Sequence, residues 1–107
     1  MVDDKGKIKI IDFGFSTTTD SRSKLSTFCG TPPYMCPELA SRQPYNGFCA
    51  DIWALGISLY LMLYGKFPFR AADERELFRL IQQGKYKVDY DLSPQVRNLM
   101  EKMLKGD

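Results

Sequence analysis

One acidic residue, Asp12, stands where a carboxylate could do chemistry, in the series Asp12-Phe13-Gly14 directly after an Ile-rich segment. A carboxylate presented on a short turn after a strand offers the hard oxygen that Mg²⁺ prefers. A three-residue match of this kind is weak evidence when it stands alone. The chain contains no His, which excludes His general bases and nearly all common zinc sites within these residues.

The three cysteines, Cys29, Cys36 and Cys49, are an odd number, and they form no C-x-x-C pair. This pattern favours reduced thiols in an intracellular protein over a disulfide framework. A redox-sensitive thiol at Cys29, which lies among Thr, Phe and Gly, is the alternative interpretation.

Length and composition indicate one domain, because the chain has 107 residues, 44% of them hydrophobic. Its 15 basic and 13 acidic residues are nearly balanced, so no electrostatic footprint for nucleic acid is present. The N-terminus lacks the apolar stretch of a secretory signal. The strongly apolar run at 52–64 has thirteen residues, too few to cross a bilayer. We therefore expect a cytoplasmic protein with no membrane or nucleic-acid partner.

The first half of the chain is predicted to be mostly irregular. Residues 7–11 read as a short strand because they are rich in Ile. Residues 16–31 hold five Thr and four Ser without periodicity, which indicates a long polar loop of a functional kind. Pro32, Pro33 and Pro37 predict a stiff, extended segment, with a short helix after Pro37.

The second half is predicted to be helical. An apolar helix over 48–64 is expected to be buried on all sides, with Asp51 in its first turn and Gly65 as its C-cap. A capping box at 73–76 predicts a helix that closes at Gly84. The apolar stripe after Ser93-Pro94 predicts a last helix that Gly106 ends. The fold class is therefore mainly α.

An ordered series of motifs resembles the C-terminal lobe of eukaryotic protein kinases. The resemblance covers essentially the whole chain, with an activation segment over 12–38. Residues 25–32 look most like Ser/Thr kinases of the calcium/calmodulin-dependent and AMP-activated group, including the microtubule-affinity-regulating branch. The motifs are Asp12-Phe13-Gly14, Cys29-Gly30-Thr31-Pro32-Pro33-Tyr34-Met35-Cys36-Pro37-Glu38, Asp51-Ile52-Trp53-Ala54-Leu55-Gly56 and Pro68-Phe69.

This resemblance implies roles for the residues around the reaction. Asp12 would be the Mg²⁺ ligand, and Asp12, Phe13 and Gly14 would contribute to the ATP site, with Phe13 as an apolar latch or simply a core residue. Thr27 matches the site that an upstream kinase phosphorylates, with Ser26 as a competing acceptor. Thr31 matches the residue that hydrogen-bonds the catalytic Asp, and Thr31, Pro32, Pro33 and Tyr34 would support the protein substrate.

Four further residues receive structural roles from the same resemblance. Glu38 would be buried against an Arg that these residues do not include, and Asp51 would accept hydrogen bonds from the catalytic loop. Trp53 is expected to pack in the core under Pro37-Glu38. Gly56 would permit close helix packing.

The 107 residues lack several parts of the phosphotransfer machinery. They contain no Gly-rich phosphate loop, no ATP-pairing Lys strand and no His-Arg-Asp loop. The resemblance therefore predicts part of a Ser/Thr protein kinase that uses ATP and Mg²⁺, whose partners include the remainder of the kinase domain, and that is inactive in isolation. The alternatives are a non-catalytic binding module that presents the activation segment and the helix at 73–83, and an unrelated helical domain with chance matches.

Overall fold

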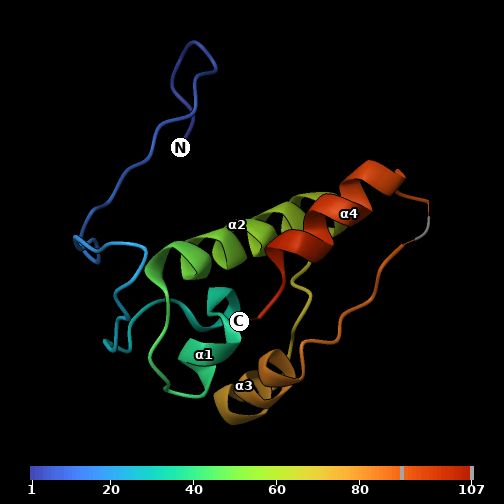
Figure 1. Cartoon of the computed structure of the whole chain (residues 1–107). Coiled ribbons are helices and arrows are strands. Elements are labelled where there is room, and N and C mark those ends of the chain that lie inside the picture. The colour runs from blue at the N-terminus through green and yellow to red at the C-terminus, as the bar shows by residue number, and fades with distance from the viewer. Residues whose placement is uncertain (90, 107) are drawn as a thin grey trace.

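The computed structural model describes residues 1–89 and 91–106 of the chain. Its elements are one 3₁₀ helix followed by four α-helices, so the predicted mainly α class is confirmed (Figure 1). In chain order they are η1 (Pro32–Tyr34), α1 (Pro37–Ala40), α2 (Gly47–Tyr64), α3 (Glu74–Gln83) and α4 (Pro94–Met103).

Local capping explains where the three longer helices begin. The Asn46 side chain accepts hydrogen bonds from the backbone N–H groups of Phe48 and Cys49 at the start of α2. Asp73 and Ser93 do the same for the first turns of α3 and α4. These side chains satisfy backbone donors that a helix start leaves without intrahelical partners.

Two glycines explain where α2 and α3 end. Gly65 has φ 70° and Gly84 has φ 69°, a left-handed conformation in which a side chain costs energy. Both C-caps were predicted from the sequence and are confirmed.

The helices pack in two pairs around one core. α1 lies against α3, α2 lies against α4, and η1 contacts both α2 and α3. A Cβ added at Gly56 would lie 2.9 Å from Leu104 Cδ2 and 3.0 Å from Met103 Cβ, so the absent side chain lets α4 approach α2. The predicted packing role of Gly56 is confirmed. The buried core is Met35, Cys36, Leu39, Ala40, Tyr45, Trp53, Ile57, Tyr60, Phe69, Leu77, Ile81, Met100 and Leu104.

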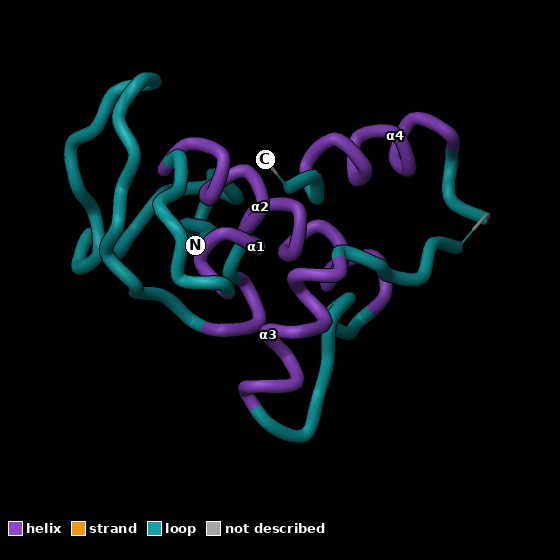
Figure 2. Tube along the Cα trace, turned by 60° about the horizontal axis from the view of Figure 1, so that its bottom comes forward, coloured by secondary structure: helices purple, strands orange, loops and turns teal. Residues whose placement is uncertain are grey.

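The predicted strand over 7–11 is wrong. Figure 2 shows helix and loop but no strand in the described part of the chain. Ile8 forms only an isolated bridge with Val2, and Ile10 is 83% exposed. Lys9 exchanges two backbone hydrogen bonds with Met1, at 2.8 and 3.1 Å, but this pairing is too short to form a strand. Ile-rich composition favours a strand only where a neighbouring strand supplies backbone partners over several residues.

The predicted loop at 16–31 is confirmed, and a backbone pairing with Tyr45 is one of the contacts that hold it. Leu25 and Tyr45 exchange both backbone hydrogen bonds, at 2.8 and 2.9 Å. The following segment is less extended than expected, because Pro32–Tyr34 forms a 3₁₀ turn. The φ that a proline ring imposes suits such a turn, and its missing N–H is not needed at the first positions.

Three local expectations about the helices need correction. Asp51 lies in the second turn of α2, because that helix begins at Gly47 behind the Asn46 cap. The capping box at 73–76 is half formed, since the Glu76 carboxylate pairs with Arg79. α4 ends at Met103 with Leu104 as its C-cap, before the expected Gly106.

Helix α2 is not buried on all sides. Trp53, Ile57 and Tyr60 face the core, whereas Leu55 is 56% exposed and Met62 is 75% exposed. With 18 residues it is also longer than the apolar run from which it was predicted, and by length and composition alone it could cross a membrane. The length of this helix therefore does not exclude a membrane span, contrary to the expectation from the thirteen-residue run. α2 packs against α4 and η1 along its buried side only.

Candidate functional site: the activation segment

The Asp12 carboxylate is exposed on a tight turn. Asp12 has φ 62°, and its Oδ1 accepts a hydrogen bond from the Gly14 N–H at 3.2 Å. The Phe13 carbonyl accepts bonds from both the backbone N–H and the hydroxyl of Ser16, at 3.0 and 2.7 Å. The turn therefore presents the carboxylate to solvent.

One accessible carboxylate fits the role of a single magnesium ligand, since Mg²⁺ is commonly held by one or two carboxylates together with water and substrate phosphates. Within residues 1–89 and 91–106, no group of three or more His, Cys, Asp or Glu side chains could hold a metal ion. The described residues thus offer one candidate ligand, Asp12, and no closed metal site. Phe13 is 68% exposed, so its interpretation as a core residue is wrong.

The segment around Thr27 is held at its backbone while its side chain faces solvent. The Tyr45 hydroxyl donates a hydrogen bond to the Thr27 carbonyl at 2.8 Å. The next residue, Phe28, packs edge-on against Phe78 of α3 with ring centroids 6.1 Å apart. The Thr27 hydroxyl is therefore accessible at a fixed place.

Arg42 is a residue near this segment that sequence reasoning missed. Its guanidinium lies 4.0 Å from the centroid of the Phe28 ring, a cation–π contact. Arg42 follows α1 and adopts φ 58°. No motif marks it, because the contact is made by folding and not by spacing along the chain.

Thr31 to Tyr34 form a ledge anchored from below. The Thr31 carbonyl accepts the Tyr34 N–H at 3.0 Å, while the Thr31 side chain makes no cap hydrogen bond and is exposed. The Tyr34 ring meets Phe67 edge-on with centroids 5.3 Å apart. Met35 and Cys36 are each 3% exposed and fix the end of the ledge in the core. Pro32 and Pro33 lie between these anchors and are half-buried.

The residues after the ledge differ in burial. Burial raises the pKa of the Cys36 thiol from 9.0 to about 11, so this thiol stays protonated at neutral pH. Glu38 is half-buried in the first turn of α1 and not fully buried as expected. A Cβ at Gly106 would lie 3.7 Å from Glu38 Oε1 and 3.5 Å from Pro37 Cγ, so the segment after α4 returns to α1 (Figure 1).

The two remaining structural residues lie on α2. Asp51 is exposed near its start. Trp53 is 1% exposed and stacks on Phe69 with centroids 6.0 Å apart, so its predicted core position is confirmed. Its indole N–H is buried and makes no hydrogen bond.

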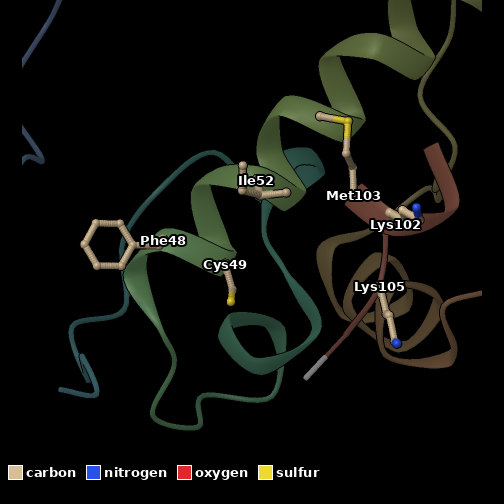
Figure 3. A pocket seen from close by; sticks show the side chains of 6 residues that line it. All are labelled: Phe48, Cys49, Ile52, Lys102, Met103 and Lys105. Carbon is tan, nitrogen blue, oxygen red and sulfur yellow. The ribbon is translucent and has the colours of Figure 1, made fainter. Parts of the chain in front are cut away.

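A shallow hollow of about 170 Å³ lies beside the exposed side of α2. Figure 3 shows the start of α2 and the end of α4 forming its walls. Lys102, in the last turn of α4, and Lys105, just after this helix, lie among the apolar side chains that line the hollow. The lining residues are Phe48, Cys49, Ile52, Lys102, Met103 and Lys105.

The structure brings together only part of the predicted site. The Thr27 segment, the ledge and the core residues are joined through Tyr45, Phe67 and Phe69. The N-terminal segment up to the Asp12 turn, blue in Figure 1, runs outside the helical body, so this turn stands apart from the ledge. Positioning Asp12 needs contacts beyond those that the described residues make.

Comparison with known proteins identifies the family of this chain, and the family match covers its whole length. Residues 1–107 match the family described as the protein kinase domain. The chain is 45% identical over 104 residues to sperm motility kinase 2B of Mus musculus, and that match covers 97% of this chain and 22% of the relative. It is 40% identical over 107 residues to CBL-interacting serine/threonine-protein kinase 15 of Arabidopsis thaliana, covering 97% of this chain and 25% of the relative. The chain thus spans a fifth to a quarter of the length of these curated relatives, and it belongs to the protein kinase domain family, among the Ser/Thr kinases.

Proposed function

We propose that this chain forms the activation-segment part of an enzyme that transfers the γ-phosphate of ATP to Ser or Thr hydroxyls of protein substrates. The observation that carries the proposal is the anchored ledge at Thr31–Tyr34, with the Thr31 side chain free toward solvent. Such a ledge can hold a substrate backbone while its hydroxyl reaches the phosphate. The membership in the protein kinase family supports the reaction class.

The reaction sets limits on what these residues do. The substrate hydroxyl oxygen bonds to the γ-phosphorus, the bond to the bridging oxygen of ADP breaks, and the hydroxyl proton must reach a base. Asp12 would hold Mg²⁺, which neutralises charge on the phosphate oxygens when bound. The 107 residues contain no His-Arg-Asp loop and no phosphate-binding Gly-rich loop. We therefore expect no phosphotransfer from these residues alone.

A γ-phosphate transfer assay tests this function. The kinase domain containing this chain should phosphorylate a Ser/Thr peptide, and Asp12→Asn should lower its rate about a hundredfold or more through loss of a metal ligand. As a control, Asp4→Asn makes the same carboxylate-to-amide change at a different exposed turn and should leave the rate unchanged. Activity of the isolated 107 residues would refute the expected incapacity.

We infer that Thr27 is the residue that an upstream kinase phosphorylates. Its side chain is exposed, its backbone is fixed by Tyr45, and the Arg42 cation stands over its neighbour Phe28. A phosphate at this position adds about two negative charges that cations can hold. Incubation with an activating kinase followed by peptide mass spectrometry should place the phosphate on Thr27. Modification of Ser26 instead would contradict this assignment.

A second function remains a candidate because the activation segment and α3 form one surface. The Phe28–Phe78 contact joins them. A non-catalytic binding module could present this surface to a protein partner. The same transfer assay separates the two functions, since a module would show partner binding but no phosphotransfer from the whole kinase domain.

A further inference from the structure

A second hollow lies at the other end of α2, away from the activation segment. Its volume is about 340 Å³, and the end of α2, the loop after it and the end of α3 bound it. None of the residues that line it within the described part of the chain is acidic, and its floor includes Phe69 and Leu80. We call it the basic hollow, after the cations that line it: Lys66, Arg70, Lys85 and Lys87.

Two of these cations follow glycine caps that fix the backbone. Lys66 follows Gly65, whose N–H donates to the Leu61 carbonyl at 2.8 Å. Lys85 follows Gly84, which ends α3 in the left-handed conformation. The position of each lysine is therefore set by the end of a helix.

Buried aromatic residues hold the backbone at or beside the other two cations. Arg70 follows Phe69, which is 2% exposed and stacked on Trp53. The carbonyl of Lys87 accepts a hydrogen bond from the hydroxyl of Tyr60 at 2.9 Å. The backbone at or beside each of the four cations is thus anchored, which lowers the backbone part of the entropy cost of binding.

Helix capping explains only part of this charge. A cation near a helix C-terminus is stabilised by the helix dipole, which accounts for Lys66 and Lys85. It does not account for Arg70 and Lys87, which lie farther along their loops. Two helix ends contribute about one negative charge together, against four full positive charges. The hollow therefore attracts anions.

The arrangement selects among anions. Helix N-termini with converging N–H groups suit a single phosphate, but this hollow adjoins the carbonyl ends of α2 and α3. Cations spread around an apolar floor instead suit several carboxylates placed about an apolar side chain. We propose that the basic hollow binds an acidic segment of a partner protein, with an apolar side chain over Phe69 and carboxylates at the four cations.

Fluorescence anisotropy of a labelled peptide, in which Glu residues flank a Phe, tests the proposal on the 107-residue chain. The peptide should bind saturably, and its affinity should fall as salt rises because the cations are exposed. The double variant Arg70→Glu with Lys87→Glu should bind about tenfold more weakly. A peptide with Lys in place of Glu should not bind.

A matched control separates local charge from net charge. Lys102→Glu with Lys105→Glu makes the same change in net charge at the hollow of Figure 3 and should leave peptide affinity unchanged. Equal weakening by both double variants would overturn the proposal. If circular dichroism shows that the Glu variant is unfolded, Arg70→Gln with Lys87→Gln replaces it and should flatten the salt dependence.

Two further probes address other anions. Inorganic phosphate should compete no better than chloride at equal ionic strength. Vesicles containing phosphatidylserine should not displace the peptide. Specific competition by phosphate or by vesicles would assign the hollow to that ligand and overturn the proposal. The experiment measures binding alone, so its outcome does not depend on phosphotransfer.

Discussion

Asp12 and Arg42 are the non-glycine residues with positive φ among residues 1–89 and 91–106. Asp tolerates this conformation because its short side chain can bond the local backbone, as it does with the Gly14 N–H. Arg has no such compensation within its own turn. At the residue scale, its contact with Phe28 offsets part of the strain.

Arg42→Ala should destabilise the chain by about 0.5–1 kcal/mol, since it removes an exposed cation–π contact and keeps the strained backbone. Arg42→Gly removes the same contact but relieves the left-handed strain, and should be about 1 kcal/mol more stable than the Ala variant. Urea denaturation of both variants measures the difference. Equal stabilities would show that the backbone at this position is unstrained.

The Cys36 thiol predicts how stability changes at alkaline pH. Its pKa is about 11 in the folded chain and 9.0 in its ordinary state, so the folded chain holds the proton more tightly between these values. Stability should therefore be retained below about pH 9 and fall by about 1–2 kcal/mol as pH rises to about 11. Denaturation across this range, with Cys36→Ala as control, measures it. If Cys36→Ala loses the same amount of stability at alkaline pH, a group other than the Cys36 thiol causes the loss.

At the scale of elements, α2 and α4 meet because Gly56 has no side chain. Gly56→Ala should destabilise the chain by about 1–3 kcal/mol, since the new methyl group overlaps Leu104 and Met103. Gly65→Ala serves as a comparison, because nothing lies within 4 Å of its added Cβ and only backbone strain applies. Differential scanning calorimetry compares them. A fully tolerated Gly56→Ala would mean that α4 shifts freely.

The Asn46 cap predicts a second effect on an element. Asn46→Ala should cost about 1 kcal/mol, because two N–H groups at the start of α2 lose their acceptor. Asn46→Asp keeps an acceptor and should be close to neutral. Thermal melts by circular dichroism measure both. Similar losses in the two variants would indicate that the Asn46 donor to the Ser21 carbonyl matters more than the cap.

Helices were the part of the fold that could be predicted from the sequence, because caps and apolar periodicity act over a few residues. The helices begin and end at residue types that favour those positions, with Asp73 and Ser93 as N-caps and Gly65 and Gly84 as C-caps. The strand at 7–11 could not be predicted reliably, since a strand needs a partner that local sequence does not specify.

At the scale of the whole molecule, α2 carries an uncovered apolar side. Ile52 is 48% exposed, Leu55 is 56% exposed and Met62 is 75% exposed. Exposed patches of this kind favour association. We infer that the remainder of the kinase domain covers this side.

The isolated chain should therefore self-associate. Ile52→Lys with Leu55→Lys should shift it toward monomer in sedimentation velocity, with little loss of stability because both side chains are exposed. Ile57→Lys is the contrasting variant, since Ile57 is fully buried and a charge there should unfold the chain. A monomeric wild-type chain with a sharp cooperative melt would contradict this expectation.

The sequence alone determined the helices, their caps and the order of motifs that indicates a protein kinase, because these depend on residue types and short spacings. Only the tertiary structure decided which side of α2 is exposed, that Arg42 covers Phe28, and that four cations meet beside Phe69. Those features join residues far apart along the chain. The free energy that stabilises these contacts comes from tertiary packing, which cannot be predicted from a short stretch of sequence.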